Sequence, residues 1–422
     1  MPTTDDQRTA RRRGGVPGPR GDSLPPAPRG AEDDAARVQQ LRRRLEALLG
    51  IPATEGNDLT LLRNGDRIFP AMLEAIRGAE RSIDFLTFVY WKGDIAAEFA
   101  RALAERARSG VRVRVLLDAV GGRLIETDLI DHMADCGVVV EWFRRPLWQG
   151  APLSPFKHNH RTHRKVLVVD ERIGFTGGVG IAEEWCGDAR DETEWRDTHV
   201  RVVGPAVDGL AAAFAQNWAE TGRPLAEEPD AFPEHEATGS SVVQVARGSA
   251  SVGWNDMATV FRVLLESATD RVTLQTAYFA PDDVFCRLLL DAVARGVDVD
   301  VLLPGPHADK RVCQLTSESI YECLVDGGVR IWAFQPSMMH AKIMTVDGLA
   351  TVIGSANLNR RSLAHDEEVV LSVFDPAVTR ELEADFWADV DRSELINPVR
   401  WGDRPVRQRA KEKVGAVLKH WM

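Results

Sequence analysis

Residues 340–357 read HAKIMTVDGLATVIGSAN, and residues 163–170 read HRKVLVVD. Each stretch places a lysine two positions after a histidine and an aspartate five positions after that lysine, in a chain with only ten histidines in 422 residues. Residues two apart in a strand project from the same face, so the histidine and lysine of each stretch lie together. The intervening runs VLVV and IMTV are apolar and favour buried strands. The repetition predicts two similar half-sites.

The segments that precede the two stretches also resemble each other. Each half contains an apolar strand, a helix ending on glycine, a second strand and a strand beginning with Gly-Val. In the first half these segments are 79–91, 98–110, 111–122 and 137–143, and in the second half 268–283, 285–296, 297–306 and 328–334. Alternating strands and helices predict a mostly parallel sheet covered by helices. We therefore expect an α/β fold built as two similar α/β/α sandwich domains in one chain.

Composition marks the limits of these domains. The first thirty residues hold six prolines, five glycines and six arginines with few large apolar side chains, which is typical of disorder. Prolines, acids and small residues mark a linker in the middle of the chain. The expected units are a disordered tail at 1–32, a first domain at 33–225, a linker at 226–241, a second domain at 242–400 and a basic amphipathic helix at 401–422.

The pair Asp347-Gly348 is a signal for a two-residue hairpin loop. In that register Val346 pairs with Leu349, and Ser355 lies opposite His340. Asn357 then follows on the same face, so one small patch gathers a histidine, a lysine, a serine and an amide.

The aspartates Asp170 and Asp347 close the two stretches. They belong to the repeated pattern and are therefore counted among the catalytic candidates with His163, Lys165, His340 and Lys342. Their place at a turn nevertheless favours a structural role over a chemical one.

Two such patches facing each other would surround one cavity with two imidazoles and two ammonium groups. This set suits a phosphodiester, because lysines bind the nonbridging oxygens while one neutral histidine attacks phosphorus and the other, protonated, donates to the leaving oxygen. The chemistry requires no metal and no cofactor. A histidine that attacks needs an acceptor on its other ring nitrogen. Asp197 and Glu368, downstream of the two stretches, are the candidates, and the alternative is that either is an ordinary surface acid.

These residues resemble the phospholipase D superfamily, whose signature is a paired H-x-K-x4-D followed by G-[SG]-x-N. Within it the sequence is most similar to bacterial cardiolipin synthases without membrane-spanning helices, over roughly residues 56–400. The resemblance implies two similar domains related by a pseudo-twofold axis, with the active site at their interface. It also implies that His163 is the nucleophile and that His340 is the general acid and then the base.

The resemblance assigns further roles by position. Lys165, Lys342, Ser355 and Asn357 would hold the phosphate, together with Gly178 in the TGG segment at 176–178. Glu368 would orient His340, and Asp197 would orient His163. One position departs from the family pattern: Gly180 stands where Asn is usual, so the first half lacks one phosphate contact.

Charge and hydropathy restrict the partners. The net charge of −11 and an isoelectric point near 5.5 argue against nucleic acid as a partner, and no apolar stretch reaches the length of a membrane span. The five scattered cysteines are typical of reduced thiols. We expect a cytoplasmic protein that acts as a monomer on anionic phospholipids at the inner face of the cell membrane. Residues 401–422 either lie on the bilayer or pack against the protein body.

The leading hypothesis is phosphatidyl transfer through a phosphohistidine intermediate, with cardiolipin made from phosphatidylglycerol or from a second phospholipid donor. Hydrolysis to phosphatidic acid uses the same residues, and the balance depends on how well the cavity excludes water. The alternatives are a phospholipase D-type hydrolase, a metal-independent nuclease or phosphodiesterase, and an inactive lipid-binding scaffold.

Overall fold

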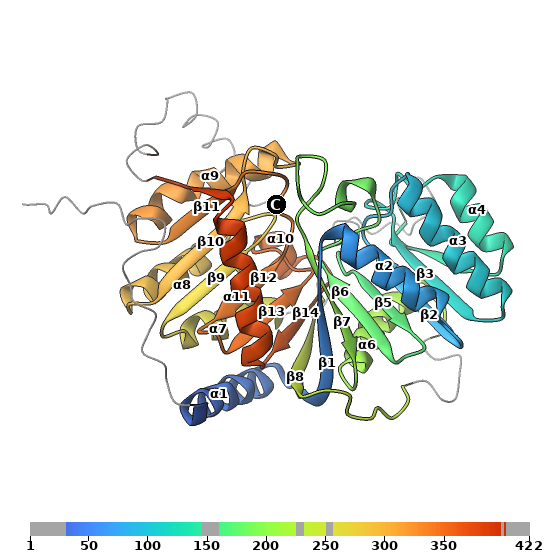
Figure 1. Ribbon diagram of the computed structural model, residues 1–422, viewed down its shortest axis with the longest axis horizontal. Helices are drawn as coiled ribbons and strands as arrows, with labels where there is room; N and C mark the ends of the chain where they lie inside the picture. Colours follow the sequence, from blue (N-terminus) through green and yellow to red (C-terminus); the bar gives the residue numbers. More distant parts are fainter. Residues whose placement is uncertain (1–30, 146–159, 225–231, 250–255, 398–400, 402–422) are drawn as a thin grey trace, which may run out of the picture.

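The computed structural model describes residues 31–145, 160–224, 232–249, 256–397 and 401. Strands and helices alternate through both halves, as the sequence predicts (Figure 1). The first half contains α1 (Ala31–Leu49), β1 (Thr54–Arg63), α2 (Asn64–Arg77), β2 (Ser82–Thr87), α3 (Asp94–Arg108), β3 (Arg112–Asp118), α4 (Thr127–Asp135), β4 (Val139–Phe143), β5 (Val166–Val169), β6 (Ile173–Gly177), the 3-10 helix η2 (Glu183–Trp185), β7 (Thr198–Val203) and α6 (Val207–Ala219).

The second half repeats the order of the first. It contains β8 (Ser241–Gly248), α7 (Asp256–Ser267), β9 (Arg271–Gln275), α8 (Asp283–Ala294), β10 (Asp298–Pro304), α9 (Arg311–Asp326), β11 (Arg330–Phe334), β12 (Ile343–Val346), β13 (Ala350–Gly354), α10 (Arg360–Ala364), β14 (Glu368–Val373), α11 (Pro376–Val390) and β15 (Ser393–Leu395). Asp375 caps α11 through its side chain and Pro376 begins it, a combination that suits a helix start.

The described strands form one continuous sheet of 15 strands in the order β15-β11-β10-β9-β12-β13-β14-β8-β1-β7-β6-β5-β2-β3-β4. Apart from β15, this order reads the same from both ends when each strand is exchanged for its counterpart in the other half. The halves meet where the first residues of β1 and β8 pair in antiparallel fashion. The expected pair of similar α/β domains is thus confirmed, although their sheets are joined at the centre.

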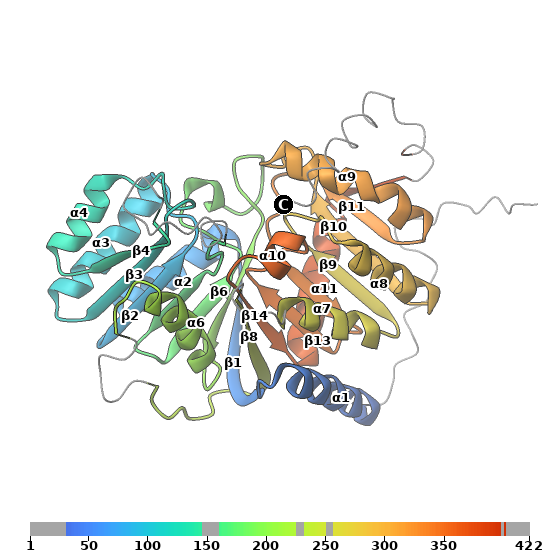
Figure 2. The ribbon, with the colours of Figure 1, turned by 180° about the vertical axis from the view of Figure 1, so that it is seen from behind.

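Three apolar cores hold this arrangement. One lies under α2, α3 and α4 in the first half, and another lies under α1, α7, α8 and α9 in the second. The third contains α6, α11 and strand residues of both halves, so the halves share apolar contacts. Figure 1 shows α2 and α11 on the near side of the sheet, and Figure 2 shows α6, α7 and α8 on the opposite side. Each half is therefore a sheet between helical layers.

Helix α1 departs from the sequence-based boundaries. It was assigned to the first domain at 33–225, but Leu41 and Leu45 lie in the apolar core of the second half, and Arg37 forms an ion pair with Asp347. Residues 33–49 adjoin the first half in the sequence, which does not show that they cover the second half. The predicted tail lies outside the described residues except for its last two positions, and the predicted C-terminal helix lies outside them except for Trp401.

The hairpin between β12 and β13 is one residue longer than predicted. Val346 pairs with Ala350 rather than with Leu349, so the loop has three residues. Its first two, Asp347 and Gly348, both have positive φ. The first half repeats this turn, because Val169 pairs with Ile173. Consequently Ser355 does not lie directly opposite His340, and it reaches the site from beyond the end of β13.

Candidate phosphoryl-transfer site

Backbone pairing between the halves brings the two histidines together. Each histidine precedes a short buried strand, His163 before β5 and His340 before β12. The amide of His163 donates to the carbonyl of Glu367 over 2.9 Å, and the amide of His340 donates to the carbonyl of Arg196 over 2.7 Å. Each histidine segment thus forms a parallel bridge with the acid-bearing segment of the opposite half.

The carboxylates pair with the histidines in the opposite sense from the prediction. Glu368 lies 3.0 Å from Nδ1 of His163, and Asp197 lies 2.7 Å from Nδ1 of His340. The family resemblance paired each histidine with the acid downstream in its own half, but the parallel bridges cross between the halves. Both imidazoles therefore donate Nδ1–H to a carboxylate and keep Nε2 for chemistry.

The two carboxylates are held by different donors. Glu368 accepts a hydrogen bond from the hydroxyl of Ser355, and Asp197 accepts one from the indole of Trp185 over 3.0 Å. Gly178, the positional counterpart of Ser355, leaves no room for a side chain, since an added Cβ would lie 2.4 Å from the Asp197 carboxylate. Ser355, predicted to bind substrate, thus supports the Glu368 carboxylate, and Gly178 leaves space for that of Asp197.

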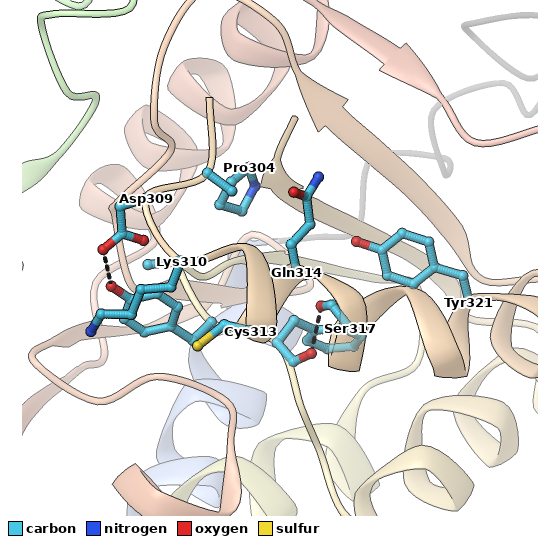
Figure 3. A pocket seen from close by; sticks show the side chains of 11 residues that line it. Pro304, Asp309, Lys310, Cys313, Gln314, Ser317 and Tyr321 are labelled. Carbon is cyan, nitrogen blue, oxygen red and sulfur yellow. Dashed lines mark hydrogen bonds between the residues drawn. The ribbon is translucent and has the colours of Figure 1, made fainter. Parts of the chain in front are cut away.

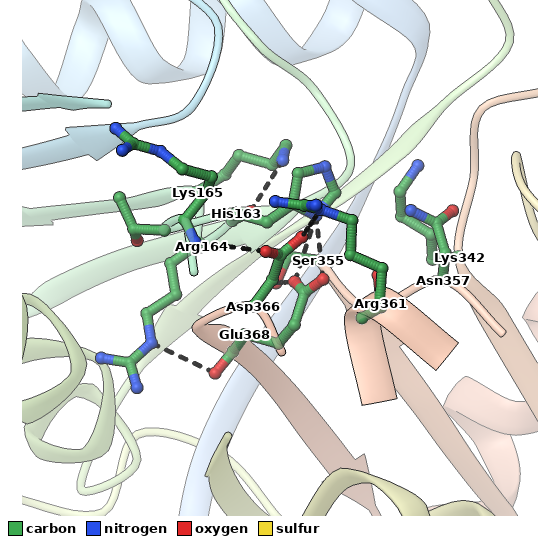
Figure 4. A network of polar contacts seen from close by, with 12 residues as sticks. His163, Arg164, Lys165, Lys342, Ser355, Asn357, Arg361, Asp366 and Glu368 are labelled. Atoms are coloured by element: carbon green, nitrogen blue, oxygen red, sulfur yellow. Dashed lines mark hydrogen bonds and ion pairs between the residues drawn. The ribbon is translucent and has the colours of Figure 1, made fainter. Parts of the chain in front are cut away.

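The lysines bend back toward their own histidines. Lys165 donates to the carbonyl of His163 over 2.7 Å, and Lys342 donates to the carbonyl of His340. The Nζ atom of Lys342 also lies 3.3 Å from Nε2 of His340. In Figure 4 His163 and Lys165 come from one half, and Lys342 and Asn357 from the other. An anion between them would meet both ammonium groups.

Burial controls protonation here. It lowers the pKa of His163 to about 4, with a further contribution from Lys165, although Glu368 opposes the shift. Burial also lowers the pKa of His340 well below its usual value, and the charges of both lysines and His163 add to the effect. Both rings are consequently neutral at pH 7 in the free protein.

Burial also shifts the pKa values of the lysines and carboxylates in the site. It lowers the pKa of Lys165 to about 7 and that of Lys342 to about 8, although nearby carboxylates oppose both shifts. Burial would raise the pKa of Glu368, but His163 and Lys165 hold it below its ordinary value. A bound phosphodiester would add negative charge, and the pKa values of both lysines would rise.

The two motif aspartates lie in the turns, away from the imidazoles. Asp170 accepts from the backbone amides of Glu80, Arg81 and Ser82, and Asp347 accepts from those of Thr269, Asp270 and Arg271. Each carboxylate ties a hairpin loop to the start of the neighbouring strand β2 or β9. These contacts match the structural role favoured at the turn and give no support to a catalytic one.

The second-half amide has no counterpart in the first half. The amide oxygen of Asn357 accepts from the backbone N–H of Tyr278 over 3.3 Å, which directs its NH2 group to other partners. At Gly180, the equivalent position, an added Cβ would lie 2.6 Å from Cβ of Val89. The first half therefore has no space for an asparagine, and the site is asymmetric.

Comparison with known proteins identifies the family. The profile of the family described as "Cardiolipin synthase, PLD-like domain" matches residues 72–218 and 261–390. The chain belongs to this family. Cardiolipin synthase A of Pseudomonas fluorescens (strain SBW25) is 35% identical over 344 residues, which cover 81% of this chain and 70% of that protein. Cardiolipin synthase 1 of Bacillus anthracis is 29% identical over 371 residues, covering 86% and 72%.

A solved structure shares the fold. The crystal structure of phosphatidylserine synthase from Haemophilus influenzae Rd KW20 aligns with a TM-score of 0.67 at 14% identity, covering 90% of this chain and 97% of that one. Among the described residues of this PLD-like protein, no helix is both long and apolar enough to cross a bilayer. The same residues hold no group of three or more histidines, cysteines and acids placed to bind a metal ion.

Sequence reasoning missed several residues of the PLD-like site. Trp185 and Trp195 flank His340, with ring centroids 5.1 and 5.3 Å from the imidazole, and Phe88 lies 5.2 Å from His163. The fully buried Arg164 donates to carbonyls of α6, β8 and β14. The sequence could have pointed to Tyr278, because this residue belongs to the segment TAYFAPDD, which contributes to the family resemblance.

Proposed function

We propose that this protein makes cardiolipin from two molecules of phosphatidylglycerol through a phosphatidyl-histidine intermediate. The observation that supports the proposal is the crossed pairing of His163 with Glu368 and of His340 with Asp197, which occupies both Nδ1 atoms and leaves neither Nε2 atom paired with these carboxylates. Membership of a PLD-type phosphatidyltransferase family directs the chemistry to a phospholipid.

In the first step Nε2 of His163 attacks phosphorus, and the P–O bond to the glycerol head group breaks. His340, protonated once the anionic phosphate is bound, donates its Nε2 proton to the departing oxygen. Lys165 and Lys342 bind the nonbridging oxygens and stabilise the charge that develops on them. The products of this step are glycerol and phosphatidyl-His163.

In the second step the terminal hydroxyl of another phosphatidylglycerol attacks the same phosphorus. The now neutral His340 accepts the hydroxyl proton, the P–N bond breaks and its electron pair returns to His163. Two phosphatidylglycerols thus give one cardiolipin and one glycerol. If water takes the place of the second lipid, the product is phosphatidic acid.

We place this reaction at the inner face of the cell membrane. One chain supplies both histidines and both lysines, so a monomer has a complete site. The sequence of residues 401–422 combines an apolar stripe with basic residues, which suits contact with anionic lipid, although this segment lies outside the described residues apart from Trp401.

Incubating the purified protein with phosphatidylglycerol vesicles in the presence of a metal chelator tests the proposal. We expect cardiolipin and glycerol in equal amounts, and loss of both products with His163→Ala. Phosphatidic acid alone would assign a hydrolase instead. DNA cleavage without lipid turnover would favour the nuclease, and a phenotype that survives His163→Ala would favour the scaffold.

A further inference from the structure

A small pocket lies between the segment that follows β9, the end of β10 and the first turns of α9. Figure 3 shows Asp309 and Lys310 together at one end of this pocket and Tyr321 at the other. The hydroxyl of Tyr278 donates to Asp309 over 2.7 Å, and Nζ of Lys310 lies 4.8 Å from the centre of the Tyr278 ring. We call Tyr278, Asp309 and Lys310 the rim trio. It presents an acceptor and a donor side by side.

The rim trio is connected directly to the phosphoryl-transfer site. The backbone of Tyr278 holds the amide of Asn357, and its ring centroid lies 6.4 Å from that of His340. The charge of Lys310 contributes to the lowered pKa of His340, and the charge of Asp309 partly opposes the lowering of the Lys342 pKa by burial. An alcohol bound at the rim would therefore be within reach of His340.

The geometry of displacement fixes the side on which an alcohol must lie. The attacking and leaving atoms of a phosphoryl transfer are roughly in line through phosphorus. With His163 on one side, the alcohol that departs and the alcohol that enters must both lie on the side of His340, which exchanges their proton. The rim trio lies on this side.

We propose that the rim trio is the subsite for this alcohol and that it selects an uncharged polyol, such as the glycerol of a phosphatidylglycerol head group. This inference rests on the proposed function and names the acceptor that the site prefers. The polyol lies at the mouth of the pocket, because the pocket itself has room for only about one water molecule. Its reacting hydroxyl faces His340, and its remaining hydroxyls contact the rim trio.

The paired charges explain why an uncharged polyol fits best. Asp309 accepts hydrogen bonds from hydroxyl groups, and Lys310 can donate to a hydroxyl oxygen. An ammonium head group such as that of ethanolamine would gain from Asp309 but would meet the like charge of Lys310. A simple alkyl alcohol would leave both charged groups without a partner on the ligand.

Competition between acceptors tests this selectivity. The full-length protein is given phosphatidylglycerol with equal concentrations of isotopically labelled glycerol and 1-propanol, and the two exchanged lipids are quantified by mass spectrometry. We expect the wild type to prefer glycerol and Asp309→Asn to reduce the glycerol-to-propanol ratio about tenfold, since hydrogen bonds to a charged group contribute more than those to a neutral one. Tyr278→Phe should shift the ratio in the same direction, because Asp309 loses the phenol that orients it.

Two further variants complete the test. Asp326→Asn makes the same chemical change at the other end of α9 and should leave the ratio unchanged. In a parallel competition between labelled glycerol and ethanolamine, Lys310→Met should raise the share of ethanolamine product. If Asp309→Asn keeps the glycerol-to-propanol ratio of the wild type, the subsite proposal is wrong, while the proposed function stands. A wild type that makes no exchanged lipid would end the proposed function and the subsite with it.

Discussion

The two histidines have the same kind of partner, a buried carboxylate, but the two carboxylates are held by different donors. Each donates Nδ1–H to a buried carboxylate, yet Ser355 holds one carboxylate and Trp185 holds the other. The difference follows from a single position. A serine at residue 178 would occupy the space of the Asp197 carboxylate, so glycine is required there and the indole supplies the missing donor.

Trp185→Phe should therefore weaken the orientation of His340 through Asp197. We expect kcat for lipid transfer to fall about tenfold with KM nearly unchanged, because the lost hydrogen bond to a charged acceptor positions a proton-transfer group and does not touch the lipid. Trp185 acts in this argument as a positioning residue.

Trp218→Phe is the matched control for that variant. Trp218 is as buried as Trp185, but its indole nitrogen has no hydrogen-bond partner within the described part of the chain. Losing this N–H should leave kcat unchanged within about twofold. Equal effects of the two substitutions would mean that ring packing, and not the hydrogen bond to Asp197, accounts for the loss.

The protonation of the lysines predicts how activity depends on pH. In the free protein Lys165 has a pKa of about 7 and Lys342 about 8, and each pH unit above a pKa lowers the charged fraction about tenfold. Raising the pH from 7 to 9 therefore removes the cations that bind phosphate. We expect kcat/KM for a short-chain phosphatidylglycerol to fall at least about tenfold over this interval.

On the acid side His163 does not limit the reaction above about pH 5, since its pKa of about 4 keeps it neutral there. The kcat profile should fall less steeply on the alkaline side than kcat/KM, because bound phosphate raises the pKa values of both lysines. A kcat/KM that rises between pH 7 and 9 would contradict the assignment of Lys165 and Lys342 to phosphate binding.

At the scale of elements, the repeated hairpins show where sequence reasoning succeeds and where it stops. The strand character of the runs VLVV and IMTV follows from their composition and is confirmed, but the histidine and lysine of each stretch lie just before the strand. The register was wrong by one residue because Asp347-Gly348 suits a three-residue loop as well as a two-residue one. The crossed pairing of Glu368 with His163 depends on bridges between the halves, which no local pattern encodes.

Asp347→Asn should lower stability while sparing the chemistry of the folded protein. Asparagine tolerates the positive φ of 54° at this position, but its neutral side chain binds the three amides at the start of β9 more weakly and loses the ion pair with Arg37. We expect a loss of about 1–3 kcal/mol in urea unfolding, with kcat per folded molecule within about threefold of wild type.

Asp58→Asn is the control, because Asp58 is exposed on β1 and the same change there should cost no more than about 0.5 kcal/mol. If Asp347→Asn abolished turnover without lowering stability, the aspartate would have a chemical role. That result would restore the catalytic assignment that the family pattern suggests.

At the scale of the whole molecule, the site exists because the two halves join in one sheet and share an apolar core. They share the core around α6 and α11. They are also joined by ion pairs, whose partners cannot be read from the sequence. Helix α11 contributes two such ion pairs, one turn apart: Asp389 binds Arg196 over 2.9 Å, and Asp385 binds Arg63 over 2.7 Å. Arg196 also supplies the carbonyl that accepts from the backbone of His340.

Burial should decide which of these two ion pairs contributes more to the stability of the protein. The Asp389–Arg196 pair is almost fully buried, with side-chain exposures of 7% and 5%, whereas Asp385 and Arg63 are exposed to 20% and 33%. Removing Asp389 would leave a buried guanidinium without its carboxylate, which typically costs about 3–5 kcal/mol. Removing Asp385 should cost about 1 kcal/mol or less, because water replaces an exposed partner.

Urea unfolding of Asp389→Ala and Asp385→Ala, monitored by tryptophan fluorescence, compares the two ion pairs on the same helix. We expect a single transition for both variants, with a much larger shift for Asp389→Ala and a fall in lipid transfer that reflects displacement of the Arg196 backbone from His340. Two separate transitions would show that the halves unfold independently. In that case the backbone contacts of His163 and His340, rather than the shared core, would have to hold the two histidines together.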